Sequence, residues 1–213
     1  MKVETEAKTK TLTRPPGRPR RFEAEEALDA ALELFWQQGY RSTTTRDLEN
    51  ALGLSQSSIY NAFGSKQDLL QAALDRYEAL TDRELLRPLE LSDKGLASIE
   101  SFFVALGHWV THKGRRGCML VKMMAEDGAA TQAITKRSRT YRSRVRTALR
   151  ESLARSARLG EVTSEDLEDR ADLLVGLVLG LNIAARGGAS DTELRHLLDA
   201  VRTQIRGWRV ATQ

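Results

Sequence analysis

Residues 39–70, GYRSTTTRDLENALGLSQSSIYNAFGSKQDLL, contain the start and stop signals of two short helices separated by a tight turn. Thr44 followed three residues later by Asp47 has the spacing of a capping box, in which each side chain satisfies a free backbone N–H group at a helix start. Gly53 ends that helix, and Ser55 caps the next one, QSSIYNAF, after a three-residue break. This spacing predicts a helix-turn-helix, a unit that places its second helix in the major groove of DNA.

The residues on both sides of this stretch continue the helical pattern. Upstream, the apolar stripe of a first helix consists of Leu28, Ala31, Leu32 and Phe35. Downstream, a second capping box at Ser65 and Asp68 starts a long helix that Pro88 closes. From residue 22 onward no stretch alternates convincingly with period two, so we expect an all-α fold.

Five further helices follow, which brings the expected total to nine. GLASIESFFVALGHWVTH is amphipathic, GCMLVKMMAE is short and apolar, and a long helix covers roughly 130–157. Capping boxes at Thr163 with Asp166 and at Ser190 with Glu193 start the last two helices. Because ADLLVGLVLGLNIAA is apolar around most of its circumference, it must be buried on more than one side. The last two helices therefore form either a homodimer interface arranged as a four-helix bundle or an intramolecular core.

The composition excludes several classes of protein. With 213 residues, 41% of them hydrophobic, the chain can bury a core. No apolar run approaches the roughly 20 residues that cross a bilayer, so we expect no membrane association and a cytoplasmic location. The single cysteine, Cys118, cannot form an internal disulfide. The sequence contains no glycine-rich phosphate loop and no convincing nucleophile–base set, so we expect no cofactor and no enzymatic activity.

Positive charge is concentrated in the first 21 residues, where seven Lys or Arg face two Glu for a net charge of +5. Such a polar segment cannot pack a core but can lie along a polyanion. Its GRPR sequence, residues 17–20, resembles an AT-hook, whose arginines, here Arg18 and Arg20, enter the minor groove of A·T-rich DNA. A solvated leader is the alternative. We divide the chain into a disordered basic arm (1–21), a helix-turn-helix DNA-binding domain (22–66) and a ligand-binding and dimerisation domain (67–213).

The motif in residues 39–70 strongly resembles the DNA-binding region of TetR/AcrR-family transcriptional regulators. The positions that carry the resemblance are Gly39-Tyr40, Thr43-Thr44, Gly53-Leu54-Ser55, Tyr60, Phe63 and Ser65-Lys66. The match is specific over residues 22–75 and architectural beyond them. The resemblance implies a nine-helix TetR-like fold. It also implies a ligand-responsive regulator, a repressor that a small-molecule effector releases from a pseudo-palindromic operator in double-stranded DNA.

The resemblance further implies which residues contact DNA. Thr44 and Thr45 lie at a helix N-terminus, where hydroxyls and free backbone N–H groups suit a phosphate. Arg46 can grip a guanine with two hydrogen bonds, and Gln56 and Ser57, in the first turn of the second helix, are the candidates for reading bases. The family positions that hold the DNA backbone are occupied by Ser58, Tyr60, Asn61 and Lys66.

The helix-turn-helix domain itself is acidic. Residues 22–66 carry three Lys or Arg against seven Asp or Glu, a net charge of −4. Because the electrostatic part of DNA affinity scales with the phosphates that cations neutralise, we expect the basic arm to supply much of the affinity. An architectural protein that binds DNA through the arm, with little sequence choice, is an alternative function.

In this family the helices that correspond to residues 94–186 enclose a ligand cavity. Methionine and aromatic side chains provide an adaptable apolar wall for such a cavity. The candidates for ligand binding are Phe102, Phe103, Trp109, Cys118, Met119, Met123 and Tyr141, and the alternative for each is plain core.

Two clusters in the ligand-binding domain permit further interpretations. Residues 136–158 carry nine Lys or Arg against Glu151, a net charge of +8. We interpret them as a solvated face, with attraction of an anionic effector or contact with another subunit as alternatives. His108 and His112 lie one helical turn apart and could bind a metal with Cys118 as third ligand, but no further ligand completes the set.

Cys118 follows Gly117 and two arginines, Arg115 and Arg116, at the expected start of a helix. The helix dipole and the cations favour a thiolate, which reacts with electrophiles and oxidants. A similar Gly-Cys segment occurs in members of the family that sense electrophiles through cysteine. Two interpretations stay open, a small piece of core and a redox-sensing repressor that acts through Cys118.

Overall fold

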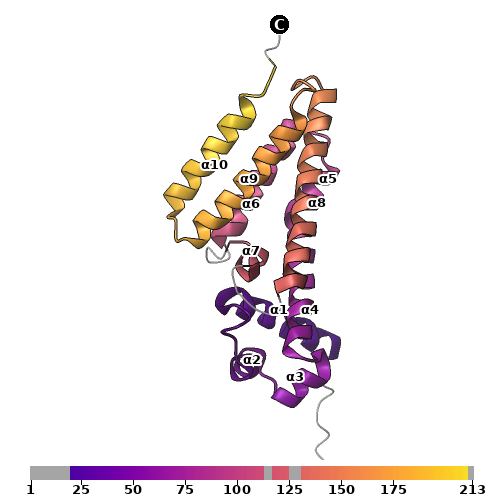
Figure 1. Cartoon of the computed structure of the whole chain (residues 1–213), viewed down its shortest axis with the longest axis vertical. Coiled ribbons are helices and arrows are strands. Elements are labelled where there is room, and N and C mark those ends of the chain that lie inside the picture. The colour runs from indigo at the N-terminus through magenta and orange to yellow at the C-terminus, as the bar shows by residue number, and fades with distance from the viewer. Residues whose placement is uncertain (1–19, 113–116, 125–130, 211–213) are drawn as a thin grey trace, which may run out of the picture.

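The computed structural model describes residues 20–112, 117–124 and 131–210, and every regular element in these ranges is helical (Figure 1). In chain order they are α1 (Arg20–Gln38), α2 (Thr45–Leu52), α3 (Gln56–Phe63), α4 (Lys66–Thr81), the π-helical turn η1 (Asp82–Leu86), α5 (Arg87–Leu91), α6 (Leu96–His112), α7 (Met119–Met124), α8 (Thr131–Arg158), α9 (Leu167–Arg186) and α10 (Asp191–Arg206). Because α4, η1 and α5 follow one another without a break, the described ranges contain nine separate helical rods. The expected all-α, nine-helix fold is confirmed.

Local capping chemistry fixes the helix-turn-helix as the sequence predicts. Thr44 Oγ1 accepts a hydrogen bond from Asp47 N–H at 3.2 Å, and the Asp47 carboxylate accepts one from Thr44 N–H at 2.8 Å. Ser55 Oγ accepts from Ser58 N–H at 3.3 Å and caps α3. Gly53 ends α2 with φ 65°, a left-handed conformation that favours glycine. The predicted capping boxes at the starts of α4 and α10 also form.

The predicted capping box at Thr163 and Asp166 is wrong. Asp166 is the N-cap residue of α9, with φ 58° and without a side-chain capping hydrogen bond. The turn before it packs against the core instead of forming a cap. Val162 is 3% exposed, and the Glu161 carboxylate accepts from the first backbone N–H of α6, that of Leu96, at 2.7 Å. Burial of this turn against α6 displaces the start of α9 to Leu167.

The prediction that Pro88 closes the fourth helix also needs correction. The chain stays helical through Leu91, with Pro88 in the first turn of α5. Proline is tolerated there because the N–H groups of a helix's first turn need no partner within that helix. The π-helical turn η1 immediately upstream changes the hydrogen-bond register before the proline.

The helices form two groups that α4 joins (Figure 1). At one end α1 packs against α2 and α4, and α3 packs against both α2 and α4. At the other end α8 packs against α9, α6 and α7, while α10 packs against α6 and α9. None of the described helices has the length and apolar character that crossing a bilayer requires. The α4 helix therefore belongs to both groups and provides a rigid connection between them.

Three aromatic rings fill the junction of the two groups. Trp36 of α1 lies edge-on to Tyr77 of α4 with ring centroids 5.2 Å apart, and 5.8 Å from Trp109 of α6. All three rings are buried. Such large, closely packed rings have few alternative rotamers, so a displacement of α4 or α6 must move α1 as well.

Candidate DNA-reading head and effector cavity

The α3 helix exposes a polar face held by a small apolar core. Leu48 of α2 and Ile59 of α3 are 2% and 4% exposed and join the two helices. The opposite face of α3 consists of exposed residues, namely Gln56, Ser57, Ser58, Tyr60 and Asn61. A short helix with one apolar face on the protein and a polar face in solvent is suited to enter the major groove.

The start of α2 has the predicted capping box, which already engages one of the two candidate hydroxyls. The Thr44 hydroxyl is engaged with the Asp47 carboxylate at 2.7 Å, so it is already committed to the capping box. Thr45 is half-buried at the first helical position, and Arg46 is exposed. The groups at this helix start that suit a phosphate are therefore backbone N–H groups together with the Arg46 guanidinium.

Lys66 makes a contact within the protein. Its Nζ donates to the Tyr40 carbonyl oxygen at 2.6 Å and lies 4.5 Å from the centroid of the Tyr40 ring. The contact ties the start of α4 to the loop between α1 and α2. Any contact of Lys66 with DNA would therefore depend on the position of this loop.

The arm residues lie almost entirely outside the described ranges. Arg18 is not described, and of Arg20 only the backbone is, as the first residue of α1. The expected boundary of the arm at residue 21 therefore overlaps α1 by two residues.

A cavity of about 450 Å³ lies between the helices of the second group. Its volume falls within the range of small-molecule sites. Four of the candidate residues line it: Phe102, Trp109, Cys118 and Tyr141. The lining that the sequence reasoning did not select comprises Tyr77, Thr81, Leu85, Leu106, Leu120, Val121, Thr135, Ser138, Arg139, Arg142, Val145, Val175, Val178, Leu179 and Asn182.

The other three candidates, Phe103, Met119 and Met123, do not line this cavity. They are at most 1% exposed and belong to the packed core. Each lies on a helix that contributes to the wall, but its side chain points into the contact between helices. Residue type alone therefore does not separate a wall residue from a core residue, because both environments are apolar.

Cys118 does not have the thiolate character that its sequence context suggests. Burial raises the pKa of the Cys118 thiol, although hydrogen bonds from Tyr77 and from the backbone oppose the shift. Tyr77 Oη donates to Cys118 Sγ at 3.4 Å. Arg115 and Arg116 are outside the described residues, and Cys118 precedes a helix of six residues. Desolvation in the cavity wall outweighs the hydrogen bonds that favour the thiolate.

We expect native Cys118 to react slowly with iodoacetamide at pH 7, more slowly than free cysteine. The raised pKa lowers the thiolate fraction at that pH, and the rate should rise as pH increases through the thiol's pKa. Mass spectrometry of timed samples gives the rate, with urea-unfolded protein as the control that removes burial. Labelling of the native protein as fast as free cysteine at pH 7 would contradict this assignment.

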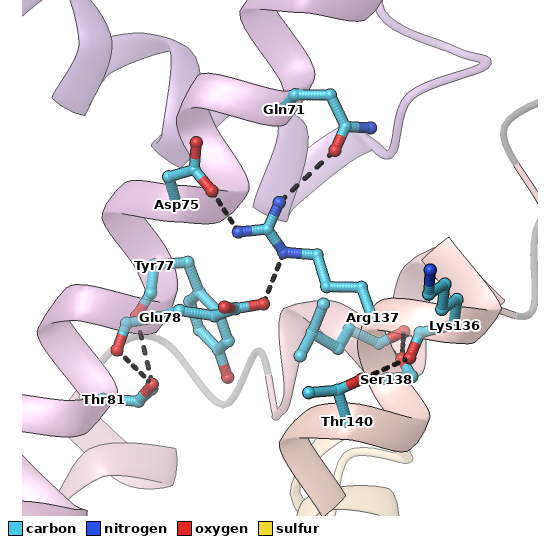
Figure 2. A network of polar contacts seen from close by, with 10 residues as sticks. Gln71, Asp75, Tyr77, Glu78, Thr81, Lys136, Arg137, Ser138 and Thr140 are labelled. Atoms are coloured by element: carbon cyan, nitrogen blue, oxygen red, sulfur yellow. Dashed lines mark hydrogen bonds and ion pairs between the residues drawn. The ribbon is translucent and has the colours of Figure 1, made fainter. Parts of the chain in front are cut away.

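The basic face of α8 is largely exposed, as its sequence suggests, but four of its arginines also pair with carboxylates of neighbouring helices. Arg137 forms ion pairs with Asp75 and Glu78 of α4 and donates to Gln71 at 3.3 Å (Figure 2). Three more arginines of α8 pair with carboxylates of neighbouring helices: Arg144 with Asp82 and Glu90, Arg146 with Glu168 and Asp172, and Arg150 with Glu168. Charge on α8 thus connects it to α4, to the η1–α5 segment and to α9.

A buried lysine connects the cavity wall to the reading head. Lys122 of α7 is 8% exposed, and its Nζ donates to the carbonyl oxygens of Trp36, at 3.1 Å, and Gln37 at the end of α1. In return, Trp36 Nε1 donates to the Gly117 carbonyl oxygen at 3.2 Å. A cation is favoured at a helix C-terminus because the last carbonyls lack intrahelical partners. The sequence signal for this contact was a single charge within the apolar segment MLVKMM.

The proposed metal site has no support within the described residues. They contain no group of three His, Cys, Asp or Glu that could hold an ion. His108 is exposed on α6, and the His112 side chain is outside the described part.

The last two helices leave an apolar groove open to solvent. Leu173 and Ile183 of α9 and Leu197 of α10 are 45%, 59% and 43% exposed. The groove between them is lined by Leu173, Gly176, Leu177, Gly180, Leu181, Ala184, Leu197, Ala200, Val201 and Gln204. Exposed leucine and isoleucine side chains along a groove are typical of an interaction surface.

Both parts of the chain match family models. The model described as bacterial regulatory proteins, tetR family, matches residues 27–73, and the model described as tetracyclin repressor-like, C-terminal domain, matches residues 95–205. The HTH-type transcriptional repressor ComR of Escherichia coli is 29% identical over 203 residues, which are 94% of this chain and 95% of ComR. The HTH-type transcriptional repressor BdcR of the same organism is 35% identical over 117 residues, 54% of this chain and 58% of BdcR.

Solved structures share the fold. A cysteine mutant of the TetR family transcriptional regulator CifR, complexed with 26-bp double-strand operator DNA, matches with a TM-score of 0.77 and 24% identity, over 90% of this chain and 100% of that chain. A TetR transcriptional regulator from Chloroflexus aurantiacus matches with a TM-score of 0.79 and 24% identity, over 90% and 98% of the two chains. The two family models match the two helical groups separately, and the C-terminal one alone spans half of the sequence. The chain belongs to the TetR family of bacterial regulatory proteins.

Proposed function

We propose that this protein is a homodimeric repressor that reads a pseudo-palindromic operator and leaves it when a small molecule fills the cavity. The observation that carries the proposal is the exposed polar face of α3, which Ile59 and Leu48 hold against α2. Relatives support it: ComR and BdcR are named transcriptional repressors, and a cysteine mutant of CifR is complexed with operator DNA. We assign a binding function rather than catalysis, and a DNA target places the protein in the cytoplasm.

A second copy of the chain is the proposed occupant of the α9–α10 groove. A Cβ atom added at Gly176 or Gly180 would meet nothing within 4 Å, so the groove leaves room for a partner helix. Two-fold pairing of α9 and α10 would form a four-helix bundle and bury Leu173, Ile183 and Leu197. The same symmetry would present two α3 helices to two inverted half-sites.

The cavity and the reading head share contacts that support effector control. Tyr77 and Trp109 line the cavity and pack against Trp36 of α1. Cys118 and Val121 also line it, and they belong to the same segment as Lys122, which contacts α1. A ligand that displaces α4, α6 or α7 would change the position of α1, on which α2 packs. A small change in the separation of two recognition helices misaligns both half-sites.

Removal of the basic arm should weaken operator binding and flatten its salt dependence. Because α1 begins at Arg20, the suitable truncation removes residues 1–19, which contain five of the seven arm cations. Loss of phosphate contacts reduces counterion release, so the slope of log affinity against log salt should become shallower. Fluorescence anisotropy titrations at several salt concentrations measure both quantities. An unchanged slope would show that the arm does not contact phosphates.

Footprinting on DNA that contains the protein's own promoter tests the proposed function. A repressor that reads a dyad should protect one short segment, and the protected segment should keep its boundaries as protein concentration rises. Broad protection that spreads with concentration would instead support the architectural alternative, in which the arm binds without sequence choice.

A further inference from the structure

Six of the eight arginines of α8 fall into two classes. Arg137, Arg144, Arg146 and Arg150 are ion-paired with carboxylates of neighbouring helices. Arg139 and Arg142 are exposed, and no carboxylate or hydrogen-bond acceptor pairs with either side chain within the described residues. Both of these arginines line the cavity. Two exposed arginines of α8 without a carboxylate partner are thus located where a ligand would bind.

These two arginines also line a second depression between α8 and α9 that adjoins the cavity. It shares Arg139, Arg142, Val175 and Leu179 with the cavity. The carboxylate in this depression, Asp172, is paired with Arg146, whose hydrogen bonds lower the pKa of Asp172. The carboxylate that shares this depression with Arg139 and Arg142 therefore does not cancel their positive potential.

Inside the cavity one buried amide has a free acceptor. Asn182 of α9 is 5% exposed, and its Nδ2 donates to the Val178 carbonyl oxygen at 2.8 Å. A carbonyl oxygen can only accept, so this contact orients the amide and leaves Oδ1 without a donor in the described residues. Because Asn182 lines the cavity, its Oδ1 is available to a ligand or a water that donates to it.

The remaining wall determines the shape of a suitable ligand. Phe102, Leu106 and Trp109 form its α6 side, and Val145 and Val175 lie on α8 and α9. Tyr141 of α8 is half-buried, and desolvation raises the pKa of its hydroxyl, which therefore stays neutral at physiological pH. This wall accommodates an apolar or aromatic body, while Arg139 and Arg142 supply charge and Asn182 an amide.

We propose that the effector is an amphipathic anion, with a carboxylate, sulfonate or phosphate held by Arg139 and Arg142 and an aromatic or aliphatic body in the cavity. A hydroxyl or N–H group on that body donates to Asn182 Oδ1. The inference rests on the proposed function in that it takes the cavity as the effector site. Guanidinium groups bind such oxyanions through charge-assisted hydrogen bonds.

Two fluorescent probes distinguish the contribution of the ligand's charge to binding from that of its apolar body. Anilinonaphthalene sulfonate and phenylnaphthylamine share the same ring system, and the first carries a sulfonate that the second lacks. We expect replacement of both arginines, Arg139→Gln with Arg142→Gln, to weaken sulfonate binding by on the order of tenfold and to leave the neutral probe unchanged. Arg150→Gln removes one charge from the same helix outside the cavity and should change neither affinity.

A variant that fills the cavity shows where the probes bind. Val178→Trp should abolish binding of both probes, and an unchanged far-UV circular dichroism spectrum and urea unfolding midpoint would show that the variant is folded. If both probes bind and the double arginine variant weakens both affinities equally, or neither, the effector is not an anion, but the assignment of the cavity as the binding site is retained. If neither probe binds the full-length protein, or Val178→Trp leaves both affinities unchanged, the effector cavity itself is wrong.

Discussion

Replacement of Lys122 with methionine should weaken operator binding by about tenfold and lower the free energy of unfolding by about 2 kcal/mol. The Lys122 ammonium holds two carbonyl oxygens at the end of α1, and a methionine of similar length fills the space without donating. The stability loss arises because buried acceptors without partners cost roughly 1–3 kcal/mol. The affinity loss arises because α1, on which α2 packs, is no longer fixed relative to α7.

Lys136→Met is the matched control for this variant. Lys136 carries the same charge on α8 but is exposed, and loss of an exposed charge should change stability by no more than about 0.5 kcal/mol. Urea unfolding followed by tryptophan fluorescence gives the free energies, and anisotropy with labelled operator gives the affinities. Equal behaviour of the two variants would show that Lys122 does not connect α7 to the reading head.

Gln56→Ala should reduce discrimination at one base-pair position by about 1–3 kcal/mol per half-site. Gln56 is exposed in the first turn of α3, and its backbone N–H is held by the Glu49 carboxylate at 2.7 Å, which leaves the side chain free to reach a base edge. A paired glutamine and adenine exchange two hydrogen bonds, and alanine makes neither. The loss should therefore be largest on operators that carry the preferred base.

The control for this prediction is Gln38→Ala, which removes an exposed glutamine at the end of α1. It should leave both affinity and base preference unchanged. Competition titrations against operators altered at single positions measure the discrimination. A uniform loss of affinity on every sequence after Gln56→Ala would mean that Gln56 contacts the backbone rather than a base.

The local parts of the fold were predictable because their causes are local. A capping box needs two residues three positions apart, and the boxes at Thr44 and Ser65 formed as the sequence indicated. The same rule failed at Thr163, where burial of Val162 and the contact of Glu161 with α6 decide where α9 starts. Burial against a distant helix leaves no signature in a four-residue pattern.

The parts of the site that sequence reasoning missed depend on long-range partners. Arg137 pairs with Asp75 and Glu78, which are 62 and 59 residues away, and Lys122 with Trp36, 86 residues away. A charge run gives no indication of which of its members meet a carboxylate. Cys118 illustrates the same limit, because its neighbours in the sequence suggested a thiolate and its surroundings in the fold raise the pKa of the thiol.

The central claim is that two copies of α3, related by two-fold symmetry, read a specific DNA sequence. Selection of bound duplexes from a random pool by the full-length protein tests it most directly. The account predicts an enriched pair of inverted half-sites whose centres are separated by a fixed distance, and loss of one preferred base pair per half-site when Gln56→Ala protein is used. Enrichment of a single unpaired motif, or of nothing beyond A·T content, would contradict it.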